Sequence, residues 1–210
     1  MPVTMKQVTG SNPASSSLRV SIQQSLDGHS FSRPAPDRWP AVEGSGMLEV
    51  ELILPHAALV PEALFDPDAA RELLAANGTP AGEEEQVVCC KPQNGVVALV
   101  AVDRAMLEQL EGRYPGRLNF STPLLHEPPK REKTIWIARR ENLLYVKVYR
   151  DGLLQLAEVI PAPGPEEVTY FIERLGQLFP LADFELRLSG DEDKSIRKTF
   201  GKRFKTLLCE

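Results

Sequence analysis

The fold is decided by residues 133–208, which read KTIWIARRENLLYVKVYRDGLLQLAEVIPAPGPEEVTYFIERLGQLFPLADFELRLSGDEDKSIRKTFGKRFKTLL. Three runs in it, 134–137, 143–149 and 153–160, are rich in β-branched, aromatic and aliphatic residues, which favour strands. Polar residues 139–142 separate the first two runs. Asp151-Gly152 stands between the second and the third, where it supplies the positive backbone angles of a tight hairpin turn. The stretch therefore predicts a meander of three antiparallel strands.

A helix is predicted directly after this meander. Gly164 suits its N-cap, Pro165 suits its first position, and two glutamates then place negative charge at the positive end of the helix dipole. Its apolar residues recur at steps of three and four before Pro180 ends it: Val168, Phe171, Ile172, Leu175, Leu178 and Phe179. The alternating run 184–188 predicts a strand. A last helix is predicted after it, with one apolar face made of Ile196, Phe200, Phe204, Leu207 and Leu208.

The predicted order is three antiparallel strands, a helix, a strand and a helix. This is the element order of the ribonuclease-H-like fold, which is also the repeated unit of actin-like ATPases, sugar kinases and heat-shock ATPases. We therefore expect an α+β protein, α/β by some schemes, with mixed sheets and flanking helices.

Composition narrows the classes of function. The chain has 210 residues, 42% of them hydrophobic and 25% charged, as in an ordinary soluble globular protein. The net charge of -5 argues against general nucleic-acid affinity. No apolar run approaches the ~20 residues of a membrane span, and no apolar core of a signal peptide is present. Adjacent Cys89 and Cys90 are interpreted as small buried hydrophobic residues in a strand, so we expect a cytoplasmic protein. The three histidines lack the spacing of metal ligands, so we expect no metal site.

The first half predicts a second lobe. Residues 1–17 have the composition of a flexible tail, residues 18–126 an N-terminal ribonuclease-H-like lobe, 127–133 a linker and 134–210 the C-terminal lobe. The predicted elements of the first lobe are listed by position: a hairpin of 18–22 with 29–32, a strand at 47–54, a helix capped by Asp66, a hairpin of 86–91 with 96–102 over Asn94-Gly95, a helix capped by Asp103, and a strand at 118–121.

Several short motifs occur together in order along the chain. They are SLRVS at 17–21 with LDGHSFS at 26–32, LVP at 59–61, STPLL at 121–125 and LRLSG at 186–190. With them the chain resembles an uncharacterised bacterial family, a domain of unknown function, with an actin-like ATPase fold. The resemblance covers nearly all of the chain after residue 17. Since the family has no established activity, it implies the fold more than the function.

The resemblance implies where a nucleotide would lie. Actin-like ATPases hold Mg-ATP between two lobes, with backbone amides of hairpins at the phosphates and a glycine-rich turn at the adenosine. In this chain Asp27, Gly28 and Ser30 offer an acid, a glycine and a hydroxyl at the first hairpin, and Gly190 occupies the adenosine position. The second-lobe hairpin at 138–142 has arginines and no glycine, and three acids follow Gly190. The sequence therefore departs from the pattern of the ATPases.

Three functional interpretations follow. The leading one is a non-enzymatic protein with a degenerate nucleotide site, acting as a scaffold or interaction partner of another protein and needing no cofactor. The alternative is a protein that binds or hydrolyses ATP with magnesium through Asp27, Gly28, Ser30 and Gly190. The third is an anion or nucleic-acid binder that uses Arg139, Arg140 and the basic last helix. A solvated helix face explains those basic residues without a nucleic-acid partner.

Overall fold

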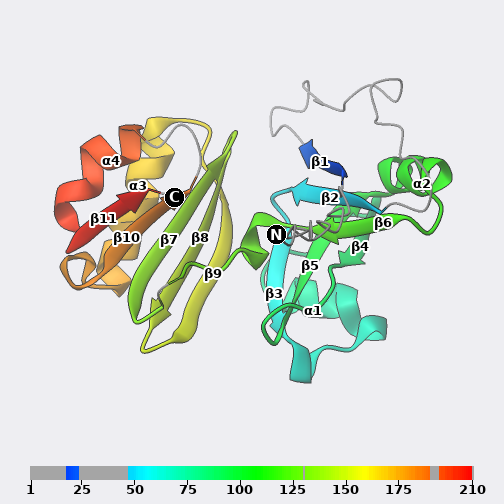
Figure 1. Cartoon of the computed structure of the whole chain (residues 1–210), viewed down its shortest axis with the longest axis horizontal. Coiled ribbons are helices and arrows are strands. Elements are labelled where there is room, and N and C mark those ends of the chain that lie inside the picture. The colour runs from blue at the N-terminus through cyan, green and yellow to red at the C-terminus, as the bar shows by residue number, and fades with distance from the viewer. Residues whose placement is uncertain (1–17, 24–46, 130, 190–193, 210) are drawn as a thin grey trace, which may run out of the picture.

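The computed structural model describes residues 18–23, 47–129, 131–189 and 194–209 (Figure 1). We call the described residues up to 126 the N-terminal part and those from 133 the C-terminal part. The C-terminal part is a five-stranded mixed sheet with helices on the face turned away from the N-terminal part (Figure 1).

The predicted meander is confirmed as β7 (Lys133–Arg140), β8 (Leu143–Arg150) and β9 (Leu153–Pro161), paired antiparallel. β10 (Glu185–Ser189) lies parallel to β7, so the sheet order is β11-β10-β7-β8-β9. At the β8–β9 turn, Asp151 has φ 53° and Gly152 has φ 78°, the left-handed conformation that the sequence pair was expected to adopt. The α+β class with mixed sheets and flanking helices is confirmed.

The helix after the meander is α3 (Pro165–Leu178). The backbone N–H of Gly164 donates to a carboxylate oxygen of Glu167 at 3.0 Å, which fixes the start of the helix. Val168, Ile172 and Leu175 are buried against the sheet, as the spacing predicts. A second helix, α4 (Lys194–Phe200), packs Ile196 and Phe200 into the same core.

The last helix is shorter than predicted, which corrects the sequence interpretation. After α4 the chain makes a 3-10 turn at Gly201–Arg203 and then forms β11 (Thr206–Cys209), parallel to β10. The apolar spacing of residues 196, 200, 204 and 207 suits a helix, but the helix ends at Gly201, a residue that disfavours helical structure. Residues 206–209 instead satisfy their backbone hydrogen bonds by pairing with β10. Leu207 therefore packs against the core, whereas Leu208 is 38% exposed.

Two substitutions in β11 distinguish this strand from a helix. Leu207→Lys is expected to cost about 1–3 kcal/mol, because the charge would meet the core, while Leu208→Lys is expected to stay within about 0.5 kcal/mol. In a helix both residues would lie near the same face, and both substitutions would cost similar amounts. Urea unfolding of the two variants measures the difference.

The N-terminal part has two three-stranded sheets. β1 (Leu18–Gln23), β2 (Leu48–Ile53) and β6 (Leu118–Ser121) are parallel, and β3 (Ala57–Pro61), β5 (Val96–Asp103) and β4 (Glu85–Cys89) are antiparallel. Two helices accompany them, α1 (Ala70–Ala76) and α2 (Arg104–Arg113). The strand at 47–54, the Asn94-Gly95 hairpin and the strand at 118–121 are confirmed.

Both predicted helix caps are present in the N-terminal part. The Asp66 carboxylate accepts from the backbone N–H of Asp68 at 3.0 Å, in the 3-10 turn that leads into α1. The Asp103 carboxylate accepts from the N–H of Met106 at 2.8 Å at the start of α2. Each cap satisfies one of the donors that the first turn of a helix leaves unpaired.

Other details of the N-terminal part differ from expectation. β1 pairs with β2 in parallel, Leu18 opposite Leu48, and the hairpin partner expected at 29–32 lies outside the described residues. β3 is a strand that the sequence did not predict, because Pro55 lies just before it and Pro61 is its last residue. Of the adjacent cysteines only Cys90 is buried, where burial raises its thiol pKa to about 12, whereas Cys89 is exposed on the other face of its strand.

One hydrophobic core crosses from the N-terminal to the C-terminal part. On the C-terminal side it contains Trp136, Ala138, Leu143 and Tyr145, and on the N-terminal side the strands β2, β3 and β5, α2 and the 3-10 turn Pro123–Leu125. The Tyr145 hydroxyl donates to the buried backbone carbonyl of Leu54 at 3.2 Å. We call this contact region the seam. The two parts are therefore packed together over apolar side chains rather than joined only by a linker.

Candidate functional site

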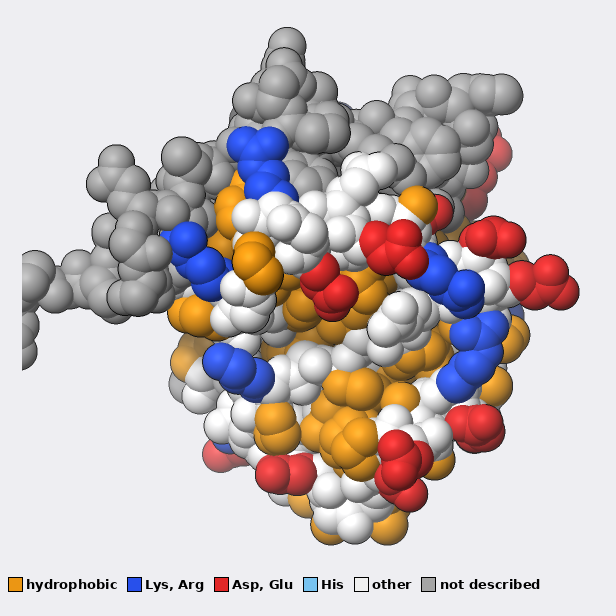
Figure 2. Space-filling view, turned by 90° about the vertical axis from the view of Figure 1, so that its right-hand side faces the viewer, with side chains coloured by type: hydrophobic (Ala, Val, Ile, Leu, Met, Phe, Trp, Pro, Cys, Tyr) orange, Lys and Arg blue, Asp and Glu red, His pale blue; other side chains and the backbone are white. Residues whose placement is uncertain are grey.

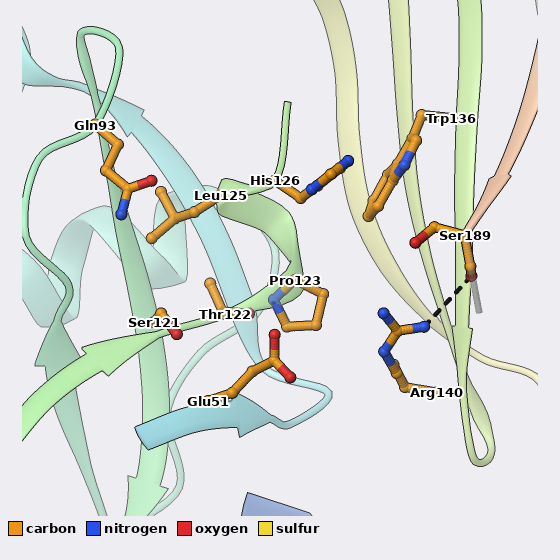
Figure 3. Close-up of a pocket in the computed structure, with 10 residues that line it drawn as sticks. All are labelled: Glu51, Gln93, Ser121, Thr122, Pro123, Leu125, His126, Trp136, Arg140 and Ser189. Atoms are coloured by element: carbon orange, nitrogen blue, oxygen red, sulfur yellow. Dashed lines mark hydrogen bonds between the residues drawn. The ribbon is translucent and has the colours of Figure 1, made fainter. Parts of the chain in front are cut away.

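The four residues predicted to hold a nucleotide, Asp27, Gly28, Ser30 and Gly190, lie outside the described residues. Their neighbourhood is partly described. Ser189, which precedes Gly190, and Arg140, from the second-lobe hairpin, both line a cavity of about 310 Å³ between the two parts (Figure 3). The other lining residues are Glu51, Gln93, Ser121, Thr122, Pro123, Leu125, His126 and Trp136.

Topology explains why polar side chains meet at this cavity. Glu51 and Ser121 are neighbours in register near the carboxyl ends of the parallel strands β2 and β6. Arg140 and Ser189 end β7 and β10, which are also parallel. Ligand sites in open sheets with parallel strands form beyond the carboxyl ends of the strands. The cavity is therefore where this architecture favours a ligand, and both parts contribute to it.

Arg140 is the cationic group of the cavity. It is half-buried, and its Nη1 donates to the backbone carbonyls of Arg139 at 3.0 Å and Ser189 at 3.3 Å. These two bonds tie the end of β7 to the end of β10 and hold the guanidinium at the cavity wall. Figure 3 shows the Arg140 guanidinium and the Glu51 carboxylate on opposite sides of the cavity. Arg139 differs, because its Nε donates to the carbonyl of Glu141 at 3.3 Å and it does not line the cavity.

Trp136 forms another wall. The side chain is 1% exposed, and its indole Nε1 has no hydrogen-bond partner in the described part of the chain. The ring stacks on His126 with centroids 5.1 Å apart and planes 24° apart. A buried N–H donor without a partner is uncommon in native proteins, because desolvation of the donor costs free energy.

Lys147 is buried in the seam beside this wall. Its Nζ donates to the carbonyl of His126 and to the Tyr149 hydroxyl, the latter at 3.4 Å, and lies 5.8 Å from the Trp136 ring centroid. Burial lowers the pKa of Lys147 to about 8, although the nearby carboxylate of Glu127 acts in the opposite direction. The lysine therefore titrates within the range of ordinary buffers.

Replacing Lys147 by methionine is expected to remove a rise in stability with pH. The folded-state pKa of about 8 lies below the unfolded value, so between the two the unfolded chain binds more protons and stability rises with pH. From about pH 8 to 10 the wild type should gain about 2 kcal/mol relative to the variant. Urea unfolding of both proteins across this range measures the difference. Parallel pH profiles would contradict the assignment.

The described part of the cavity differs from the pattern expected for Mg-ATP in actin-like ATPases. At the second-lobe hairpin, where backbone amides should approach phosphates, Arg140 points its side chain into the space and Glu141 has φ 50° without being glycine. Glu51 is the one carboxylate on the described lining. Within the described residues, no three Asp, Glu, His or Cys side chains are grouped to hold a metal ion.

The basic run predicted for the last helix does not form one continuous surface. Arg197 and Lys198 are exposed on α4, whereas Arg203 pairs with Glu173 at 3.4 Å. Lys205 lines a separate polar cavity that also contains Asp151, Asp183 and Glu185. The basic side chains are therefore divided between different neighbours, some of them acidic.

Sequence reasoning missed Glu51, Thr122 and Trp136 as site residues. Glu51 alternates with apolar neighbours, which is typical of a solvated strand face, and Trp136 lies in a run that reads as core. One signal was present. The motif at 121–125, which contributed to the family resemblance, supplies four of the lining residues: Ser121, Thr122, Pro123 and Leu125.

Comparison with known proteins supports the fold. A solved structure from Bacteroides thetaiotaomicron VPI-5482, a protein with an actin-like ATPase fold and unknown function, is similar with a TM-score of 0.66 and 18% identity, covering 78% of this chain and 68% of that chain. The cytoplasmic domain of EpsL, an inner membrane component of the type II secretion system of Vibrio cholerae, gives a TM-score of 0.34 and 12% identity over 67% of this chain and 61% of that chain. No protein-family model and no curated protein sequence matches. This chain has an actin-like ATPase fold.

No described helix is long and apolar enough to cross a membrane.

Proposed function

We propose that this actin-like-fold protein acts without enzymatic activity, as a scaffold or interaction partner of another protein, and that its inter-lobe site no longer serves Mg-ATP. The observation that supports this is the core that crosses the seam. Actin-like ATPases hold the nucleotide between two lobes, whereas here Trp136, Ala138, Leu143 and Tyr145 of one part pack directly on the other. The remaining cavity of about 310 Å³ is at the small end of ligand pockets, which span about 300–1,000 Å³.

Calorimetric titration with ATP and magnesium tests the proposal. We expect no measurable heat at nucleotide concentrations of about 1 mM, with the protein shown to be folded by circular dichroism. Micromolar binding that is lost in Asp27→Ala would overturn the proposal and place a working nucleotide site between the parts. The test covers the whole chain, including residues 24–46 and 190–193.

The alternative remains a protein that binds or hydrolyses ATP through Asp27, Gly28, Ser30 and Gly190. One observation favours it: Ser189, the residue before Gly190, lines the cavity together with Glu51. In that case the carboxylates of Asp27 and Glu51 would lie on the side of the cavity where the water shell of a magnesium ion is held. The titration above decides between the two functions.

For the partner we assign the groove between β9 and α3. This groove has a volume of about 450 Å³ and is lined mainly by apolar side chains: Leu156, Ile160, Pro161, Tyr170, Phe171, Leu175 and Leu178. Tyr170 is 63% exposed and Leu178 is 69% exposed, which is unusual for large hydrophobic residues of a helix. The groove is therefore an apolar surface that burial against another protein would stabilise.

The charges of the groove favour a basic partner segment. Glu158 lies on the helix-facing side of β9 opposite Val146, and Glu167 also lines the groove, against the single cation Arg174. Glu166 lines the adjoining surface of α3, where Glu173 is already paired with Arg203. We therefore assign to this groove a segment of another protein with apolar residues and Lys or Arg. The opposite end of the molecule mixes charges of both signs around central hydrophobic side chains and favours neither sign (Figure 2).

Selection from a displayed library of random peptides tests the partner surface. We expect enriched peptides to combine apolar residues with Lys or Arg, and Glu158→Lys to remove that preference, because it places a cation within the groove. Glu111→Lys, an equal charge change at an exposed position of α2, is the control and should leave the selection unchanged. Peptides without basic residues, or peptides equally affected by both variants, would contradict the assignment.

A further inference from the structure

We propose that the groove between β9 and α3 receives its partner as an added β-strand, which pairs antiparallel with the outer edge of β9. The bound segment would place apolar residues opposite Leu156 and Ile160 and a lysine or arginine opposite Glu158. This inference rests on the proposed function, because it takes the same groove and the same basic partner. It adds the backbone conformation of the bound segment and its register on β9.

The outer edge of β9 carries backbone groups that can pair with a strand. β9 ends the five-stranded sheet, and no strand of the described residues pairs with its outer edge. The N–H of Ala162, directly after β9, donates to the carbonyl of Asn142 at 2.7 Å. Because hydrogen-bonded and non-hydrogen-bonded pairs alternate along antiparallel strands, residues 156, 158 and 160 direct their N–H and C=O groups to β8. Ala157 and Val159 therefore direct theirs outward.

The two ends of β9 limit the length of the segment. At one end Pro161 has no N–H to donate. At the other end the register of β9 on β8 shifts between Val148 and Tyr149, which disturbs the regular pleat. Regular pairing is therefore confined to residues 156–160, and the partner contributes a segment of the same length.

Alternation along β9 sets the pattern of the bound segment. Leu156, Glu158 and Ile160 line the groove, whereas Ala157 and Val159 pack on the core that crosses the seam. Side chains of an added strand alternate in the same way, because residues opposite each other on neighbouring strands point to the same face of a sheet. Every second side chain of the partner would therefore enter the groove, between β9 and the exposed apolar residues of α3.

Glu158 fixes the place of the basic residue. It is exposed, and its own N–H and C=O point to β8, so it would form a non-hydrogen-bonded pair with the residue opposite it on the added strand. Cβ atoms of directly opposite residues lie about 4.5–5.5 Å apart, and opposite charges at this distance are favourable. The groove cation Arg174 lies over the Tyr170 ring, 5.9 Å from its centroid, on the α3 side. The resulting pattern is apolar, any residue, Lys or Arg, any residue, apolar.

The charge of Glu158 also argues against a second copy of this chain as the occupant. If two copies paired through β9 about a two-fold axis at residue 158, their Glu158 side chains would lie directly opposite each other, and like charges in that position are destabilising. Moving the axis by one residue in either direction places Glu158 opposite Leu156 or Ile160, where a carboxylate meets an apolar side chain. A segment with a central basic residue avoids both arrangements.

N-methylation of the peptide backbone tests the inference. The peptides enriched by the selection described above are synthesised with one N-methyl group at each position in turn, and their affinities are measured by fluorescence anisotropy. We expect losses of at least about tenfold at the two residues that flank the basic residue, because their N–H groups face Ala157 and Val159. Methylation of the basic residue itself should change the affinity less than about twofold, because its N–H points away from β9.

A substitution in β9 tests the same hydrogen bonds from the protein side. Ala157→Pro removes an outward N–H and leaves the hydrogen bonds to β8, so it is expected to weaken binding at least about tenfold. Ala157→Gly keeps the N–H and is the matched control, with a loss of less than about threefold. Thermal unfolding establishes that both variants fold. The N-methyl scan uses the unaltered protein, so it decides the question even if the proline variant does not fold.

The outcomes separate the added strand from the groove itself. Losses at every peptide position, as for a bound helix, or no loss at any position would overturn the added strand. If such peptides still lost binding to Glu158→Lys, the groove would remain the partner site. A selection that yields no binding peptide, or only peptides without basic residues, would overturn both. Alternating losses together with dependence on Glu158 would support both.

Discussion

Replacing Tyr145 by alanine is expected to lower the free energy of unfolding by about 3–5 kcal/mol, the usual cost of deleting a large aromatic side chain from a core. Tyr145 is fully buried in the core that crosses the seam, between cross-strand neighbours Ala138 and Val159. Its loss also leaves the buried carbonyl of Leu54 without its hydroxyl donor. Urea unfolding measures the change.

The same substitution should loosen the contact between the two parts. Limited proteolysis at residues 127–132 is expected to accelerate more than stability alone explains, because this segment connects the two sides of the seam. Tyr145→Phe keeps the ring and should lose only about 1–2 kcal/mol. Tyr170→Ala, at a 63% exposed tyrosine of α3, is the control and should cost little. Equal losses for Tyr145→Ala and Tyr170→Ala would contradict the seam as described.

Replacing Phe200 by alanine is expected to cost a similar amount, about 3–5 kcal/mol, for a different reason. Phe200 is 1% exposed and belongs to the second core, between the sheet and the helices α3 and α4 on the face opposite the seam. This variant should therefore keep the Lys147-dependent rise in stability with pH, whereas Tyr145→Ala should reduce it. Lys198→Ala, an exposed change on the same helix, should stay within about 0.5 kcal/mol. A pH profile altered equally by both core variants would show that the two cores are not distinct.

The C-terminal part was predictable from sequence because its signals are local. Asp151-Gly152 specifies the hairpin, Gly164 and Pro165 the helix start, and the apolar stripe of α3 the buried face. Each of these depends on residues within a few positions of one another. The family resemblance and the local order of elements thus led to the same fold, which the similar solved structure supports.

The last strand shows where local reasoning fails. Residues 204–208 carry an apolar spacing that suits a helix, and only the presence of β10 as an open neighbour makes a strand more favourable. Likewise, β1 pairs with β2 in parallel because of contacts between segments far apart in sequence. Local periodicity contains no information on such partners.

The candidate site was predictable only in part for the same reason. Arg140 was recognised because it sits at a hairpin where a glycine was expected, a local departure from a pattern. Glu51 and Trp136 become site residues only when two sheets bring their strand ends together. Neither has a distinctive neighbour in sequence, so their role depends on the tertiary arrangement.

The pairing pattern also gives an expectation for the order in which the two sheets form. The C-terminal meander joins neighbouring strands through tight turns, and such hairpins form in about 1–10 μs. The parallel N-terminal sheet instead pairs Leu48 with Leu18 and Leu118, so long chain loops must close before any of its contacts form. We expect the N-terminal sheet to assemble last, against a meander that is already in place. In that order of assembly the seam face of the meander, with Trp136 and Tyr145, would be exposed to water until the N-terminal sheet covers it, and we expect the chain to be most prone to aggregation at that stage.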